Sequence, residues 1–92
     1  MTIKSEHEMA IISFRKSRSL IDRILVMMDK QEYCIDIMQQ NLAVIGLLKS
    51  AHQQLMESHL HSCFSKAMDS KQEKRKVEMV DEILKVTKMA SK

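Results

Sequence analysis

Two cysteines and one histidine are the residues of this 92-residue chain whose types and spacing could do chemistry. His59 and Cys63 are four residues apart, so on a helix they share a face and can reach one ion. Cys34 precedes His59 by 25 residues. On one unbroken helix that separation is about 37 Å, so the three side chains cannot meet within a single chain.

An antiparallel pair of such helices would bring the three side chains together. Cys34 of one copy would then lie beside His59 and Cys63 of the other, and two-fold symmetry would give two equivalent sites per dimer. Two thiolates and one imidazole are soft ligands that favour Cu(I), whereas structural Zn(II) takes four ligands. The alternative is that Cys34 and Cys63 are core residues, since a buried cysteine behaves as a small hydrophobic residue.

The elements that must position these residues are helices. The chain has no Pro, one Gly and 3% aromatic residues, a composition that disfavours an all-β fold. Apolar residues recur at helical spacing over residues 33–64, which predicts one long central helix. The pattern also predicts a shorter helix over 8–30, a turn at 29–32, a loop or helix start at 69–75 and a short third helix over 77–86. We therefore predict an all-α fold of three helices with a long central helix.

Composition narrows the class of protein further. We expect one domain over residues 1–92, with about the first eight residues flexible. No apolar run approaches the roughly 18 residues of a membrane span, and two cysteines without a secretion signal favour the cytoplasm. The net charge of +3 is compatible with binding to nucleic acid. No catalytic triad or phosphate-binding loop is present, so we expect neither an enzyme nor a small-molecule substrate.

The chain resembles the CsoR/RcnR family at two segments, YCIDI at residues 33–37 and ESHLHSC at residues 57–63. Members of this family are small all-helical bacterial repressors that sense copper, nickel or cobalt, formaldehyde, or reactive sulfur. The resemblance covers roughly residues 14–90. It implies an antiparallel homodimer of long helices that assembles into a homotetramer.

The resemblance also implies a copper site. Copper-sensing members use Cys, His and Cys, which match Cys34, His59 and Cys63, so Cu(I) is the expected ligand. Tyr33 resembles a family tyrosine that supports the metal-bound histidine together with a glutamate of the third helix, for which Glu78 and Glu82 are the candidates. Sulfur-sensing members keep both cysteines but lack the histidine, which makes a persulfide-sensing repressor the nearest alternative.

The expected DNA-binding residues depart from the family pattern. Ser19 and Leu20 stand where members usually carry Gly-Gln, and Ile45 replaces a family arginine, with Lys49 one turn later as a substitute. Phosphate contacts need only positive charge, so operator DNA remains the expected partner and a copper-responsive repressor the expected function. A Cu(I)-binding relative that has lost DNA binding is a further alternative. The remaining candidate DNA-binding residues lie in the first helix: Arg15, Lys16, Arg18 and Arg23.

Overall fold

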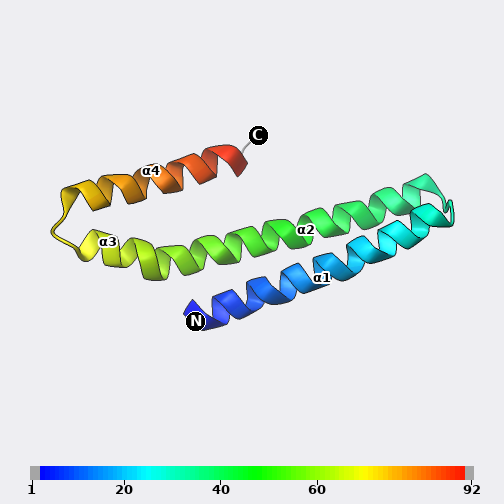
Figure 1. The fold of residues 1–92 in the computed structure, drawn as a ribbon, viewed down its shortest axis with the longest axis horizontal. Coiled ribbons are helices and arrows are strands. Elements are labelled where there is room, and N and C mark those ends of the chain that lie inside the picture. Colours follow the sequence, from blue (N-terminus) through cyan, green and yellow to red (C-terminus); the bar gives the residue numbers. More distant parts are fainter. Residues whose placement is uncertain (1–2, 91–92) are drawn as a thin grey trace. The chain divides into compact units, whose positions relative to one another are not determined.

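A computed structural model describes the backbone of residues 3–90 and the side chains of residues 7–90. Within that range the chain is helical and contains no strand, which confirms the all-α prediction. None of the described helices is long and apolar enough to cross a membrane. The elements, in chain order, are α1 (Ile3–Asp29), α2 (Cys34–His59), the π-helical segment η1 (Leu60–Phe64), α3 (Ser65–Asp69) and α4 (Glu73–Ala90) (Figure 1).

The chain divides into two compact units, Met1–Ser58 and His59–Lys92, and each is described by itself. In the first unit, α2 runs back along α1, and the two helices form an antiparallel hairpin (Figure 1). Of the segment expected to be flexible, residues 1 and 2 lie outside the described residues, and the remainder forms the first turns of α1.

Small residues form the seam between α1 and α2. Buried positions on both helices recur at spacings of three, four or seven residues, which is the pattern of two helices packed along a coiled-coil seam. Ala51 is fully buried there, so the backbones approach closely with little side-chain volume between them. The buried seam residues are Ala10, Ser13 and Ser17 on α1 and Val44, Ala51 and Ser58 on α2.

Serine hydroxyls satisfy the polar groups in this seam. Ser13 Oγ donates to Gln54 Oε1 on α2 at 3.4 Å. Ser17 Oγ donates to the Ser13 carbonyl oxygen one turn earlier in α1, at 2.8 Å. A buried hydroxyl without a partner would cost free energy, so these bonds explain how the seam tolerates Ser13 and Ser17 on α1.

The turn between α1 and α2 ends the first helix with a left-handed residue. Gln31 has a φ of 54°. Its N–H donates to the Met28 carbonyl, and the Glu32 N–H donates to the Met27 carbonyl, each at 3.0 Å. This pair of bonds is the Schellman arrangement, which satisfies the last carbonyls of a helix. The carbonyl of Tyr33 then accepts the first bonds of α2. The turn therefore lies at residues 30–33, one residue later than predicted.

The second unit begins at His59, the last residue of α2, and continues with the π-helical segment η1. Ser65 Oγ donates to the Leu60 carbonyl oxygen, five residues earlier, at 2.8 Å. A hydroxyl that bonds to a backbone carbonyl of the preceding turn competes with the regular helix ladder, and this bond spans the five-residue segment. The single central helix predicted over 33–64 is therefore three consecutive helical segments, which together reach Asp69.

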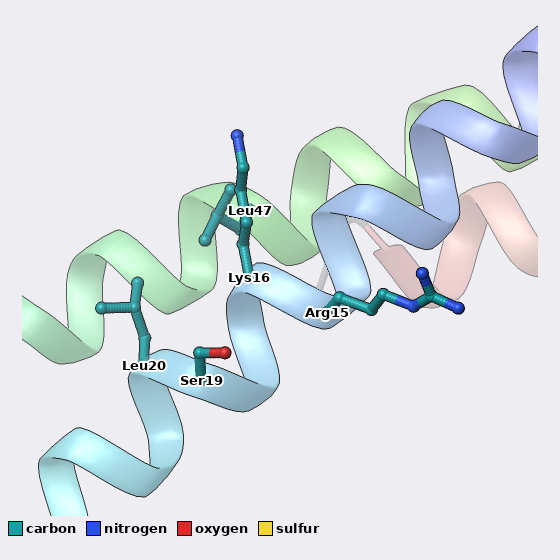
Figure 2. A pocket seen from close by; sticks show the side chains of 5 residues that line it. All are labelled: Arg15, Lys16, Ser19, Leu20 and Leu47. Carbon is teal, nitrogen blue, oxygen red and sulfur yellow. The ribbon is translucent and has the colours of Figure 1, made fainter.

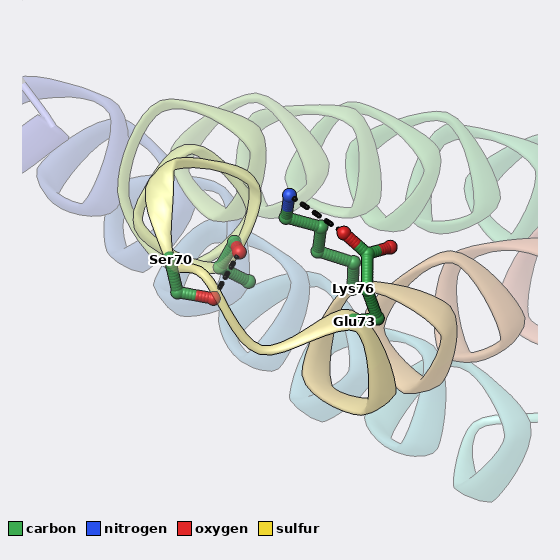
Figure 3. Close-up of polar contacts among 4 residues, drawn as sticks. Ser70, Glu73 and Lys76 are labelled. Atoms are coloured by element: carbon green, nitrogen blue, oxygen red, sulfur yellow. Dashed lines mark hydrogen bonds and ion pairs between the residues drawn. The ribbon is translucent and has the colours of Figure 1, made fainter.

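Residues 70–72 connect α3 to α4. The Ser70 hydroxyl donates to the Ala67 carbonyl at 2.7 Å, and Lys76 pairs with Glu73 at 3.4 Å in the first turn of α4 (Figure 3). The last helix begins at Glu73, within the stretch 69–75 that was predicted as a loop or helix start, and four residues before the apolar stretch 77–86. Acidic Glu73 in the first turn suits a helix N-terminus.

Most large apolar side chains of the described residues remain exposed. Phe14, Ile21 and Met28 recur every seven residues on α1, and each is at least 44% exposed. Four exposed residues of α2 recur at alternating spacings of three and four, which places them on the side of α2 away from its seam with α1. These four are Ile35, Met38, Leu42 and Ile45. Each helix of the hairpin therefore carries an apolar stripe that the first unit itself does not cover.

Candidate metal centre

Cys34 and His59 are the first and last residues of α2. The helix is regular over its 26 residues, so the two side chains are separated by about 37 Å along its axis. Their spacing corresponds to about seven helical turns, so both project from the same side of the helix. This confirms that the chain places the two residues at opposite ends of one helix.

Cys63 lies in η1, four residues after His59. Residues four apart share a face of an α-helix, and the wider turn of a π-helix keeps them neighbours. Both cysteines are free thiols with exposed side chains, and His59 is half-buried. The alternative, in which Cys34 and Cys63 are core residues, therefore does not hold within a single chain.

The described residues contain no group of three or more His, Cys, Asp or Glu side chains that could hold a metal ion within one chain. This agrees with the separation of Cys34 from His59. A three-ligand site made from these residues requires a second copy of the chain.

The donor set itself fits Cu(I). This ion prefers soft ligands. Cys34 and Cys63 supply two free thiols, and half-buried His59 supplies an imidazole nitrogen. The residues predicted to support the metal-bound histidine lie on two different helical regions. Tyr33 is 68% exposed at the start of α2, and Glu78 and Glu82 are exposed on α4, where Met79 is the buried residue. The role of these three residues stays a prediction.

The candidate DNA-binding cations of α1 fall into two pairs. Arg15 and Arg18 are three residues apart and share one side of α1, whereas Lys16 and Arg23 are seven apart and share another. None of these four has an ion-pair partner among the described residues. Lys49 follows Ile45 by four residues and lies on the uncovered side of α2. The structure therefore does not gather all five cations on one face of one chain.

A shallow cavity of about 440 Å³ lies between α1 and α2 at these cations. Leu20 and Leu47 form its apolar part, and Lys16 extends beside Leu47 while Arg15 projects away from it (Figure 2). Ser19 also lines this cavity. Ser19 and Leu20, which stand where Gly-Gln was expected, thus belong to a surface that carries the unpaired positive charges of Arg15 and Lys16.

Sequence reasoning missed two cations beside Cys63. Lys66 and Arg75 line a cavity of about 320 Å³ together with Cys63. The three-residue spacing of Cys63 and Lys66 was a usable signal. Arg75 could not be placed from the sequence because it lies beyond the connection between α3 and α4.

Comparison with known proteins places the chain in a family. Residues 9–89 match the family of metal-sensitive transcriptional repressors. Because the match covers most of the chain, this all-helical protein belongs to that family, which is the CsoR/RcnR family that the sequence segments resemble.

Individual relatives carry a more specific name. The copper-sensing transcriptional repressor CsoR of Mycobacterium ulcerans (strain Agy99) is 34% identical over 59 residues, which are 64% of this chain and 50% of that protein. The proteins of the same name from Mycobacterium bovis (strain BCG / Pasteur 1173P2) and Mycobacterium tuberculosis (strain ATCC 25618 / H37Rv) match with the same values. The chain thus spans about half the length of the curated relatives it matches. No solved structure matches it significantly.

Proposed function

We propose that this protein is a copper(I)-responsive transcriptional repressor. In this proposal, Cys34 of one protomer and His59 and Cys63 of its partner bind Cu(I) across the interface of an antiparallel homodimer, and the loaded protein releases operator DNA. The observation that carries the proposal is the position of the soft ligands. Cys34 begins α2, His59 ends it, and Cys63 follows four residues later.

The exposed apolar stripe of α2 supports the dimer. Ile35, Met38, Leu42 and Ile45 lie on the side of the helix that α1 leaves uncovered, and an antiparallel copy of α2 would cover them. The same arrangement brings the start of one α2 beside the end of the other. Two such dimers forming a cytoplasmic tetramer complete the proposal.

The unpaired cations of α1 support DNA binding. Arg15, Lys16, Arg18 and Arg23 have no acidic partners among the described residues, so each is available to a phosphate, and an oligomer multiplies the set. Repression and its release then need only a coupling of about 1–3 kcal/mol between the metal site and the DNA-binding surface.

Fluorescence anisotropy on the protein's own upstream DNA tests the whole proposal. The measurement is made without oxygen, with and without one Cu(I) per protomer. We expect tight binding by the apo protein and its loss on Cu(I) addition. Tight binding that Cu(I) leaves unchanged would contradict copper responsiveness, and Cu(I) binding by a protein that never binds this DNA would favour a Cu(I)-binding relative without DNA recognition.

Replacement of Cys34 by alanine isolates the bridging ligand. We expect Cys34→Ala to weaken Cu(I) binding at least tenfold, because one of two thiolates is lost and soft sulfur ligands supply most of the affinity for this ion. Competition with a Cu(I) chelator measures the affinity. Gln39→Ala, at an exposed position of the same helix outside the apolar stripe, serves as the control. Native-like affinity of the Cys34→Ala variant would rule out the bridging site.

A persulfide-sensing repressor is the second candidate, favoured by the exposure of both free thiols. Cys34 of one protomer and Cys63 of its partner would then join through a di- or polysulfide. Mass spectrometry after treatment with an organic persulfide distinguishes the two functions. A cross-linked dimer whose formation releases DNA would support sulfur sensing.

A further inference from the structure

The cavity beside Cys63 has a chemical character that the proposed metal site does not use. Its lining residues all belong to the second unit of the chain. Two of them are cations, one is a free thiol, and none is a carboxylate. The residues are Cys63, Lys66, Ala67, Ser70 and Arg75.

Both cations of this cavity are available to an anion. Lys66 is exposed and has no ion-pair partner among the described residues. Arg75 pairs with Glu78 at 3.7 Å, and both side chains are about half exposed. An ion pair of this length and exposure contributes little free energy, so Arg75 can turn towards a ligand without a large loss.

The acids of the neighbouring turn do not neutralise the cavity. Glu73 is held by Lys76 at the start of α4 (Figure 3). Asp69 ends α3 but does not line the cavity. The hydroxyl and N–H of Ser70 both donate to the Ala67 carbonyl, at 2.7 and 3.2 Å, which fixes the chain where it reverses towards Arg75. The cavity therefore places the charge of Lys66, and that of Arg75 once it turns from Glu78, next to a thiol.

We infer that this cavity receives Cu(I) as an anionic complex with a small thiol that bears carboxylates. Lys66 and Arg75 bind the carboxylates and so bring the complex to the Cys63 thiol. The inference rests on the proposed function, and it assigns Lys66 and Arg75 a positioning role in loading the site.

The exchange at Cys63 is a ligand substitution. Cys63 Sγ forms a bond to copper, one carrier sulfur–copper bond breaks, and the proton of the Cys63 thiol goes to the released carrier thiolate. Copper stays in the +1 state, so no oxidant or reductant is needed. Nearby cations raise the local concentration of an anionic reactant and its association rate, by roughly tenfold or more.

The test compares the rate of Cu(I) transfer from two donors. One donor is the anionic Cu(I) complex of glutathione, and the other is the cationic Cu(I) complex of acetonitrile. Stopped-flow absorbance follows the thiolate-to-copper charge-transfer band without oxygen. The variant Lys66→Gln/Arg75→Gln removes the two cations of the cavity. The control Lys85→Gln/Lys88→Gln makes the same change in net charge at exposed positions of α4.

We expect transfer from the glutathione complex to slow about tenfold in Lys66→Gln/Arg75→Gln and to change less than twofold in the control. Transfer from the acetonitrile complex should not slow in either variant. Circular dichroism checks that both variants stay helical, and chelator competition checks that their equilibrium affinity for Cu(I) is unchanged.

Three results would overturn the inference. The first is native-like transfer from the glutathione complex by the cavity variant, and the second is equal slowing in the control, which would indicate bulk charge. Either leaves the proposed function intact. The third is failure of the native protein to take up Cu(I) from both donors, which contradicts the proposed function as well.

Discussion

Gln31 occupies a position that suits glycine. With a φ of 54° it holds the left-handed conformation that ends α1 and lets Glu32 reach back to Met27. A residue with a Cβ pays about 1–2 kcal/mol for that conformation, whereas glycine adopts it freely. The sequence at this turn therefore carries local strain next to the start of α2, which is Cys34.

Replacing Gln31 by glycine should stabilise the protein. Relief of the left-handed strain, less the entropy that glycine loses on folding, gives an expected gain of about 0.5–1 kcal/mol in the free energy of unfolding. Urea denaturation at fixed protein concentration measures it. Gln39→Gly, at an exposed position inside α2, should instead lose about 1 kcal/mol. A loss in both variants would contradict the left-handed conformation.

The candidate metal ligands could be predicted from the sequence, because the prediction needs only the residue types and the rise per residue of a helix. The spacing of Cys34 and His59, in a chain without proline, already required opposite ends of one helix. Lys66 and Arg75 could not be found in this way. Their approach to Cys63 depends on where the chain reverses at Ser70, and a serine hydroxyl that bonds to a carbonyl leaves no periodic signal.

At the scale of elements, the contact of α1 with α2 is unlike the one that the sequence pattern indicates. Large apolar residues such as Ile21 and Leu25 suggested a broad apolar stripe, but they are exposed. Small residues fill the seam, and Ala51 is fully buried. Periodicity locates a helix well, but it cannot decide which of two faces meets the neighbouring helix and which remains for another partner.

Enlarging Ala51 should separate the two helices. We expect Ala51→Leu to lower the free energy of unfolding by about 1–3 kcal/mol, because a close-packed seam has no room for three further carbon atoms. Thermal and urea denaturation measure the loss. Ala43→Leu makes the same change at an exposed position of α2 and should alter stability by less than about 0.5 kcal/mol. Equal stability of the two variants would show that α1 and α2 are not closely packed at Ala51.

The division of the helical stretch after His59 into separate segments could not be predicted from the sequence. The helix predicted over residues 33–64 starts within one residue of the observed one, since no Pro interrupts it, but the helical stretch continues to Asp69 in three segments. The π-helical segment Leu60–Phe64, across which the Ser65 hydroxyl donates to the Leu60 carbonyl, was not predicted, because it leaves no signal in the apolar periodicity. Such segments change the direction of side chains locally, here at Cys63.

At the scale of the whole molecule, a shared site can be tested by mixing protomers. Cys34→Ala and the double variant His59→Ala/Cys63→Ala each lack part of every site as homodimers. A mixed dimer regains one complete site. We expect unfolding and refolding of an equal mixture to restore tight binding of about one Cu(I) per four protomers, measured by chelator competition. No restoration would contradict a site made by two protomers.

The small number of buried apolar residues has a consequence for the life of the protein in a cell. Only Ala10, Val44, Ala51, Ala67 and Met79 are buried apolar residues among the side chains described. Such a thin core supplies little of the free energy that must offset chain entropy, and in the proposed dimer the apolar surface of the other copy would supply more. Folding is then linked to association. Synthesis level would therefore set how much of the protein is folded at all, and a cell that makes very few copies would lose them to proteolysis before they could act.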